Sequence, residues 1–241
     1  MGACSGKGSV EGPRAEFSPE ASPSWLAEPW SPDMGNKLQD VVDRIFERPE
    51  NQALKSFGFS FTIADPNIED CPLIGCSTGF ADLCGYCMDE IVGRNCRFLL
   101  NSVPPELINK NVQRWSRQFC EAVRNGEDFQ IPATEREPWM PEGRHSDDGL
   151  FCVQKNARKD GSLFNNAFYL KMIELNDRRF IVGLQFELPD RSEGQEVYAK
   201  AMRILDKNMW DVQKQFSRTF WVMSSMARQE ETGEDDGYES D

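Results

Sequence analysis

A cysteine flanked by cationic and amide side chains is the most reactive feature of this sequence. Cys96 lies between Arg94 and Arg97 and directly follows Asn95, while Gly93 allows a tight backbone turn just before this group. A nearby guanidinium favours the thiolate form of a cysteine and so increases its reactivity. We therefore predict a reactive thiol on a loop; the alternative is an inert cysteine that only packs between arginines.

Three side-chain amides lie further along the chain. Asn156 comes five residues before Gly161 and Asn166 comes five residues after it, so a hairpin that turns at this glycine brings both amides to one face. Gln185 lies in the middle of a predicted strand, where a polar side chain facing inward needs a partner. Because an amide both donates and accepts hydrogen bonds, the three amides suit a ring with carbonyl and N–H groups. The alternatives are a turn cap at Asn156 and solvent-facing amides at the other two positions.

A second group of cysteines offers different chemistry. Cys84 and Cys87 have the spacing of a redox-active pair, and Cys71 and Cys76 lie just before them. Four thiols are also a ligand set for zinc or an iron–sulfur cluster. The pair lacks a βαβ context, and His145, the single histidine, lies in a polar insertion and suits neither a histidine-rich metal site nor a haem ligand. We keep a thiol redox or metal protein as an alternative and predict no metal.

The spacing of apolar residues predicts the elements that must position these side chains. Phe57, Phe59, Phe61 and Ile63 alternate strictly, which predicts a strand with one buried face. The other predicted elements are a helix over 35–48, a strand over 72–77, short helices over 78–92, a helix over 104–124, an insertion at about 125–148, and strands over 150–155, 162–173 and 179–187. This order predicts an α+β fold in which helices cover one face of a five-stranded antiparallel sheet.

The clearest helical periodicity lies near the C-terminus, over 190–228. Its apolar stripe is Val197, Ala201, Leu205, Met209, Val212, Phe216, Phe220 and Met223. A helix of about 30 residues is roughly 45 Å long, more than one domain easily covers. We therefore expect the 195–225 segment to bind a second copy of the chain or an effector protein.

The stretch Gly93-Arg94-Asn95-Cys96-Arg97-Phe98-Leu99 resembles the signature of the LOV (light-oxygen-voltage) branch of PAS domains, the flavin-binding blue-light sensors. The similarity extends over about residues 57–187 and includes Gly85-Tyr86. It implies the PAS/LOV fold, with a flanking helix at 34–54, the domain at 55–189 and the amphipathic helix after it. It also implies bound FMN and a sensor that is not an enzyme.

The same resemblance assigns roles to individual residues. Cys96 is the thiol that bonds reversibly to flavin C4a under blue light, and Gln185 is the amide that reorients when flavin N5 gains a proton. Arg97 and Arg117 are the implied phosphate ligands, with Arg114 as the alternative to Arg117. The implied cofactor-binding residues are Thr62, Asn95, Arg97, Arg117, Asn156, Asn166 and Gln185.

One departure from the family concerns Leu100, which stands where a glutamine is usual. The loss of this polar contact is expected to weaken flavin binding by about 1 kcal/mol. A PAS module that binds another ligand, or only mediates protein contacts, is therefore the remaining alternative. For the photoreceptor, the signal is expected to leave through the flanking helices.

Charge and terminal composition limit the partners. The chain has 241 residues and a net charge of -13, and its last part, 229–241, is an acidic segment that we expect to be disordered. This charge argues against a nucleic-acid partner. Residues 1–33 have the composition of a disordered tail.

The N-terminus resembles an acylation site. Gly2 is placed for myristoylation and Cys4 for palmitoylation, two signals that together give stable membrane anchoring. Neither a secretory signal nor a membrane-spanning run is evident, so we expect a reducing, cytoplasmic location with membrane association through the acyl groups.

Overall fold

We analysed a computed structural model of the chain. It describes residues 32–49, 58–136, 149–175 and 178–188, together with helical positions 203, 208, 211, 212, 214–216, 218 and 219. The predicted tails at 1–33 and 229–241 lie outside these residues, except for positions 32 and 33, which begin a helix. Residues 137–148 of the predicted insertion also lie outside them.

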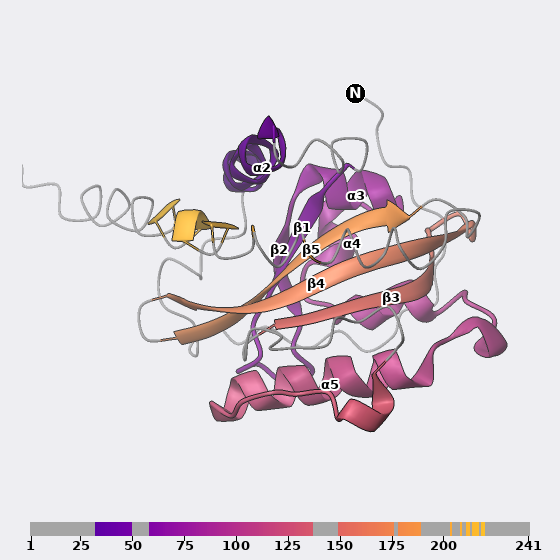
Figure 1. Ribbon diagram of the computed structural model, residues 1–241. Coiled ribbons are helices and arrows are strands. Elements are labelled where there is room, and N and C mark those ends of the chain that lie inside the picture. The colour runs from indigo at the N-terminus through magenta and orange to yellow at the C-terminus, as the bar shows by residue number, and fades with distance from the viewer. Residues whose placement is uncertain are drawn as a thin grey trace, which may run out of the picture.

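The centre of the molecule is an antiparallel sheet of five strands (Figure 1). The strands lie in the order β2-β1-β5-β4-β3, so that the first and last strands of the sequence, β1 and β5, are neighbours. This arrangement confirms the predicted α+β, PAS-like fold. The strands are β1 (Ser60–Ala64), β2 (Leu73–Cys76), β3 (Gly149–Ala157), β4 (Leu163–Leu175) and β5 (Arg178–Leu188).

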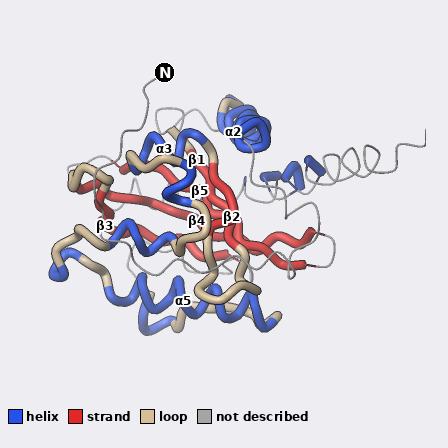
Figure 2. Tube along the Cα trace, turned by 180° about the vertical axis from the view of Figure 1, so that it is seen from behind, coloured by secondary structure: helices blue, strands red, loops and turns tan. Residues whose placement is uncertain are grey.

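Helices between β2 and β3 cover one face, which we call the inner face; Figure 2, turned by 180° from Figure 1, shows these helices in front of the sheet. They are α3 (Thr78–Cys84), α4 (Met88–Ile91), the 3-10 turns η3 (Cys96–Leu100) and η4 (Pro105–Leu107), and α5 (Lys110–Asn125). A further turn, η5 (Ala133–Glu135), lies in the insertion. The prediction started the long helix at 104, which is wrong: Asn109 caps α5 by accepting hydrogen bonds from the backbone N–H groups of Asn111 and Val112.

The opposite, outer face packs against the flanking helix α2 (Pro32–Phe46) and the C-terminal helical residues. Leu38 and Val42 of α2 and Val212 and Phe216 of the C-terminal segment are fully buried in this apolar cluster. Both flanking segments therefore share one surface of the sheet. Only isolated positions of the predicted 190–228 helix are described, so its length stays a prediction.

Burial of β1 differs from the expectation of a strand with one buried face. All five of its residues are buried, including Ser60 and Thr62, whose side chains lie on the inner face. The alternating pattern marks only the apolar outer side of the strand. The inner side is buried under the helices although its side chains are polar, and this burial brings hydrogen-bonding groups into the interior.

Candidate functional site

Polar side chains form a row on the inner face, across three neighbouring strands. The Gln185 side chain on β5 donates from Nε2 to Thr62 Oγ1 on β1 at 2.9 Å. Asn166 on β4 donates from Nδ2 to Gln185 Oε1 at 3.1 Å. Three of the residues selected from the sequence are thus joined directly, and each is at least nine-tenths buried.

The row continues toward β3 through a residue that the sequence analysis missed. Gln154 is the direct register partner of Asn166 and is also buried. Its Nε2 donates to the backbone oxygen of Lys155, while Gln154 Oε1 and Asn166 Oδ1 have no donor among the described residues. Since unpaired buried acceptors are costly, these two oxygens mark a place where a ligand donor belongs.

Asn156 connects the sheet to the turn that carries Cys96. It lies two residues after Gln154 on the same face of β3, and its Nδ2 donates to the backbone oxygen of Leu99 in η3 at 3.5 Å. The cysteine turn is therefore held over the strand that ends the amide row. Leu100, the departure from the family pattern, is half-buried at the end of the same turn.

Asn95 holds the cysteine turn from outside the amide row. Its Oδ1 caps η3 by accepting from Arg97 N, and its Nδ2 donates to the backbone oxygens of Asp70 and Cys71 at 2.5 and 3.2 Å. Asp70 and Cys71 have positive φ angles of 67° and 47°, which non-glycine residues adopt only under constraint. Asn95 thus fastens the β1–β2 loop (residues 65–72) to the Cys96 turn.

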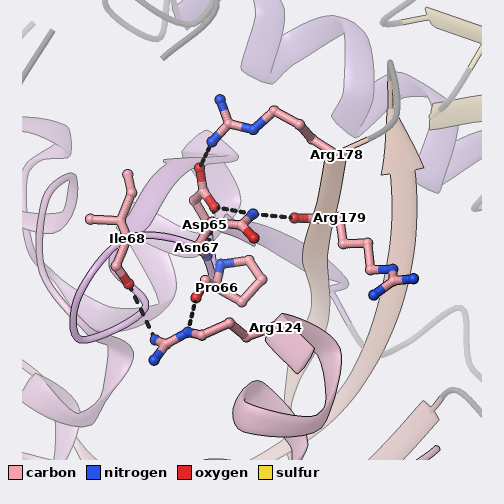
Figure 3. Close-up of polar contacts among 7 residues, drawn as sticks. All are labelled: Asp65, Pro66, Asn67, Ile68, Arg124, Arg178 and Arg179. Carbon is pink, nitrogen blue, oxygen red and sulfur yellow. Dashed lines mark hydrogen bonds and ion pairs between the residues drawn. The ribbon is translucent and has the colours of Figure 1, made fainter. Parts of the chain in front are cut away.

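Polar contacts anchor the β1–β2 loop on its other side (Figure 3). Asp65, at the end of β1, is paired with Arg178 of β5 at 2.8 Å, and its carboxylate is almost fully buried. Arg124, in the last turn of α5, donates to the backbone oxygens of Pro66 and Ile68. The loop that supports the cysteine turn is therefore connected to both the sheet and the long helix.

The arginines expected to hold a phosphate lie apart from the amide row. Arg97 forms an exposed ion pair with Asp70, and Arg114 on α5 is paired with Glu135 at 2.5 Å. Arg117 is exposed on α5. The acidic partners come from distant parts of the chain, so local sequence gave no sign of them.

The arginines beside Cys96 do not lower the pKa of its thiol. Burial of the sulfur among surrounding groups raises the pKa of Cys96 to about 12, although the residue as a whole reaches solvent. The neighbouring guanidiniums do not offset this burial: Arg97 is paired with Asp70, and Arg94 stacks over the Phe98 ring at 4.5 Å. At neutral pH Cys96 therefore carries its proton on Sγ.

The two cysteines that suggested redox or metal chemistry differ in their surroundings. Cys84 is a free, buried thiol whose pKa is raised by burial, whereas Cys87 is not among the free thiols and caps α4. No group of three or more metal-ligating side chains occurs in the described part of the chain.

A separate hollow between α5 and β5, lined by Phe119, Phe129 and Arg179, contains none of the residues that were selected from the sequence.

Gly183 is a second residue that sequence reasoning missed. It lies opposite Thr62 on the inner face, and a Cβ at this position would lie 2.8 Å from Thr62 Oγ1 and 3.2 Å from Leu170 Cδ2. Only glycine leaves this part of the face open. Its place two residues before Gln185, and therefore on the same face of β5, is the signal that could have identified it.

Comparison with known proteins finds relatives that are similar over more than half of this chain. The chain is 32% identical over 142 residues to White collar 1 protein of Neurospora crassa, covering 57% of this chain and 11% of that protein. It is 29% identical over 164 residues to Phototropin-2 of Oryza sativa subsp. japonica, covering 67% and 15% respectively. The chain therefore spans only a small part of these relatives. No family model matches it.

Among solved structures, the chain resembles the LOV domain of the Erythrobacter litoralis EL346 blue-light activated histidine kinase. The two are 30% identical, and the match covers 55% of this chain and 97% of that domain. The TM-score is 0.38, so the superposition adds no support to the sequence match.

Proposed function

We propose that this chain, which belongs to the LOV subclass of PAS domains, is a blue-light photoreceptor that binds FMN at the inner face and uses Cys96 as its reactive thiol. The observation that carries the proposal is the buried row of Thr62, Gln185 and Asn166, at whose β3 end the side-chain oxygens of Asn166 and Gln154 have no donor among the described residues. The carbonyl and N–H groups of a flavin ring match these amides.

The residues present fit this group in two further ways. Gly183 leaves open the part of the inner face where a side chain would meet Thr62 and Leu170. Phe168, Leu170 and Met172 of β4 are only half-buried on this face and supply the apolar surface that a flat aromatic ring requires. The chemistry that bound FMN would supply is absorption of blue light and a reversible bond from its C4a to Cys96 Sγ.

The chain's own residues would then do three things. Cys96, protonated because its pKa is raised, holds on Sγ the proton that flavin N5 would take up when the S–H bond breaks and the bond from Sγ to C4a forms. Gln185 donates from Nε2 in the dark and turns its amide over to present Oε1 once the group it faces becomes a donor. Asn156 holds the cysteine turn against β3.

A phosphate would have to compete with carboxylates for its arginines. Arg97 would exchange Asp70 for the phosphate, and an exposed ion pair of this kind contributes at most about 1 kcal/mol, so the exchange is inexpensive. Arg117 is the second ligand we propose, because Arg114 is engaged by Glu135.

The signal would leave through the outer face, where β1 and β5 contact both flanking segments. We propose that the 195–225 helix binds a second copy of the chain or an effector protein, and that the protein senses light without turning over a substrate. The packing of the sheet against the flanking helices would then have two states, and the orientation of the Gln185 amide on β5 would shift the balance between them.

We further propose a cytoplasmic protein that associates with membranes through acylated Gly2 and Cys4. No helix in the described residues has the length and hydropathy to cross a membrane. Mass spectrometry of protein expressed in a eukaryotic cell tests the acylation, and an unmodified mass contradicts it.

The experiment that tests the photoreceptor is an absorption spectrum of the FMN-loaded protein in the dark, after blue light and during dark recovery. We expect a structured flavin spectrum that bleaches and returns. Cys96→Ala should bind FMN without this reversible bleaching, while Cys152→Ala, which removes another buried inner-face thiol, should bleach normally. Unchanged bleaching in Cys96→Ala contradicts the proposal, as does failure of the wild-type protein to bind FMN.

A further inference from the structure

The amide row has a direction. Gln185 donates toward β1, and Asn166 donates toward Gln185, so both side-chain N–H groups that make these bonds point the same way across the sheet. The other arm of the Asn166 amide, Oδ1, therefore points away from Gln185, toward the β3 side. Gln154 lies directly opposite Asn166 on that side.

Two acceptors consequently lie together at the β3 end of the row. Asn166 Oδ1 and Gln154 Oε1 are both buried and lack a donor among the residues that the structure describes. The ring of oxidised FMN has a single N–H, so it can satisfy at most one of them. The other then has no donor from the ring or from the described residues, which makes the dark arrangement of the row unfavourable by one buried acceptor.

We propose that Gln154 is the terminal acceptor of the row and positions its light state; this inference rests on the function proposed above. When Gln185 turns its amide over, its Nε2 faces the Nδ2 of Asn166, and two donors cannot bond to each other. Asn166 must then turn over as well. Its Oδ1 accepts from Gln185, and its Nδ2 donates to Gln154 Oε1.

The light state therefore gains a hydrogen bond that the dark state lacks. This bond ends on β3, the strand from which Asn156 contacts the cysteine turn at the Leu99 oxygen. The reorientation thus reaches from β5 to the strand nearest the reactive thiol. Its effect is to stabilise the light state and to slow the return to the dark.

Two substitutions of similar shape test this role in the FMN-loaded full-length protein. Gln154→Met removes the acceptor, whereas Gln154→Glu keeps an acceptor oxygen at the same place. We expect Gln154→Met to recover in the dark roughly 2- to 10-fold faster than wild type, the factor set by one net hydrogen bond. Gln154→Glu should recover at a rate closer to wild type. Val153→Ala, on the outer face of the same strand, is the matched control and should leave the rate unchanged.

An infrared measurement separates this role from a general loss of packing. In protein labelled with 13C-glutamine, the light-minus-dark spectrum should contain side-chain carbonyl bands from two glutamines, Gln185 and Gln154. The Gln154→Met variant should lose one of these bands, a change that a purely structural role of Gln154 does not produce.

The outcomes distinguish the two proposals. If wild-type protein does not bleach reversibly, both the photoreceptor proposal and the proposed role of Gln154 are contradicted. If wild type bleaches, but Gln154→Met recovers at the wild-type rate and keeps both infrared bands, the photoreceptor stands and the role of Gln154 is overturned.

Discussion

The two faces of the sheet use the same strands, one residue apart, for different purposes. On the outer face, aromatic rings contact each other and both flanking segments: Phe59 lies 4.9 Å from Phe186, and Phe61 lies 5.2 Å from Phe216, between ring centroids. The inner face buries polar residues instead, and two of their oxygens have no donor in the part of the chain that the structure describes. Buried polar groups that cost free energy are retained where a partner compensates them, so the inner face is the one on which we propose that the ligand binds.

The largest effect that this comparison predicts is on stability. Phe61→Ala removes a fully buried ring from the outer face and should lower the free energy of unfolding by about 3–5 kcal/mol. Urea denaturation measures the change. Thr62→Val, at the next residue but on the inner face, is the control: it should cost only about 1 kcal/mol, because it removes the acceptor of Gln185 without leaving a cavity. Equal losses in the two variants would contradict the division between the faces.

The next prediction adds a methyl group to the inner face instead of removing side-chain atoms. Gly183→Ala places a Cβ 2.8 Å from Thr62 Oγ1, so side chains must shift, and we expect about 1–3 kcal/mol of destabilisation. The same methyl group should reduce FMN binding, since it fills the opening proposed for the ring. Equilibrium titration with FMN measures this, and an unchanged Kd together with wild-type bleaching would remove Gly183 from the proposed site.

The sequence predicted the face of a residue better than the partner of its side chain. Alternation located the first strand and turn residues located the others, because both signals are local properties of the chain. The spacing of Asn156 and Asn166 around Gly161 likewise placed both amides on the inner face, since the hairpin register between β3 and β4 follows from a short turn. These features depend on residues that are close in sequence.

The ion-pair partners of the arginines and the pKa of the Cys96 thiol could not be predicted from residues that are close in sequence. Arg97 pairs with Asp70, and the pKa of Cys96 is raised by burial among elements that are distant in the chain. Neither contact has a local signal. Gln154 did have one: it lies two residues before Asn156, so it had to share that residue's face, but a glutamine followed by Lys155 is also typical of an exposed strand.

The pH dependence of the Cys96 thiol on the inner face is a further test of the difference between the two faces. Because burial raises its pKa to about 12, the thiol should keep its S–H stretching band at pH 10 in the dark, whereas an unperturbed cysteine with a pKa of about 8.5 would be mostly thiolate. The stabilising contribution of this group is full below about pH 8.5 and is lost as the pH rises toward 12. Wild-type stability should therefore fall more steeply than that of Cys96→Ala between pH 8.5 and 10. An S–H band lost by pH 9 would contradict this.

The smallest predicted effect concerns the attachment of the C-terminal helix to the outer face. Arg48, just after α2, and Asp211 form an ion pair at 2.5 Å, and both side chains are about one-third exposed. Asp211→Asn should therefore change the free energy of unfolding by only about 0.5 kcal/mol, and the difference from wild type should vanish at 1 M NaCl because salt screens exposed charges. Phe216→Ala should cost several times more, independently of salt, because Phe216 is fully buried against Phe61. A larger loss from Asp211→Asn than from Phe216→Ala would mean that charge holds the two flanking segments on the sheet. Apolar contact would then no longer distinguish the outer face from the inner one.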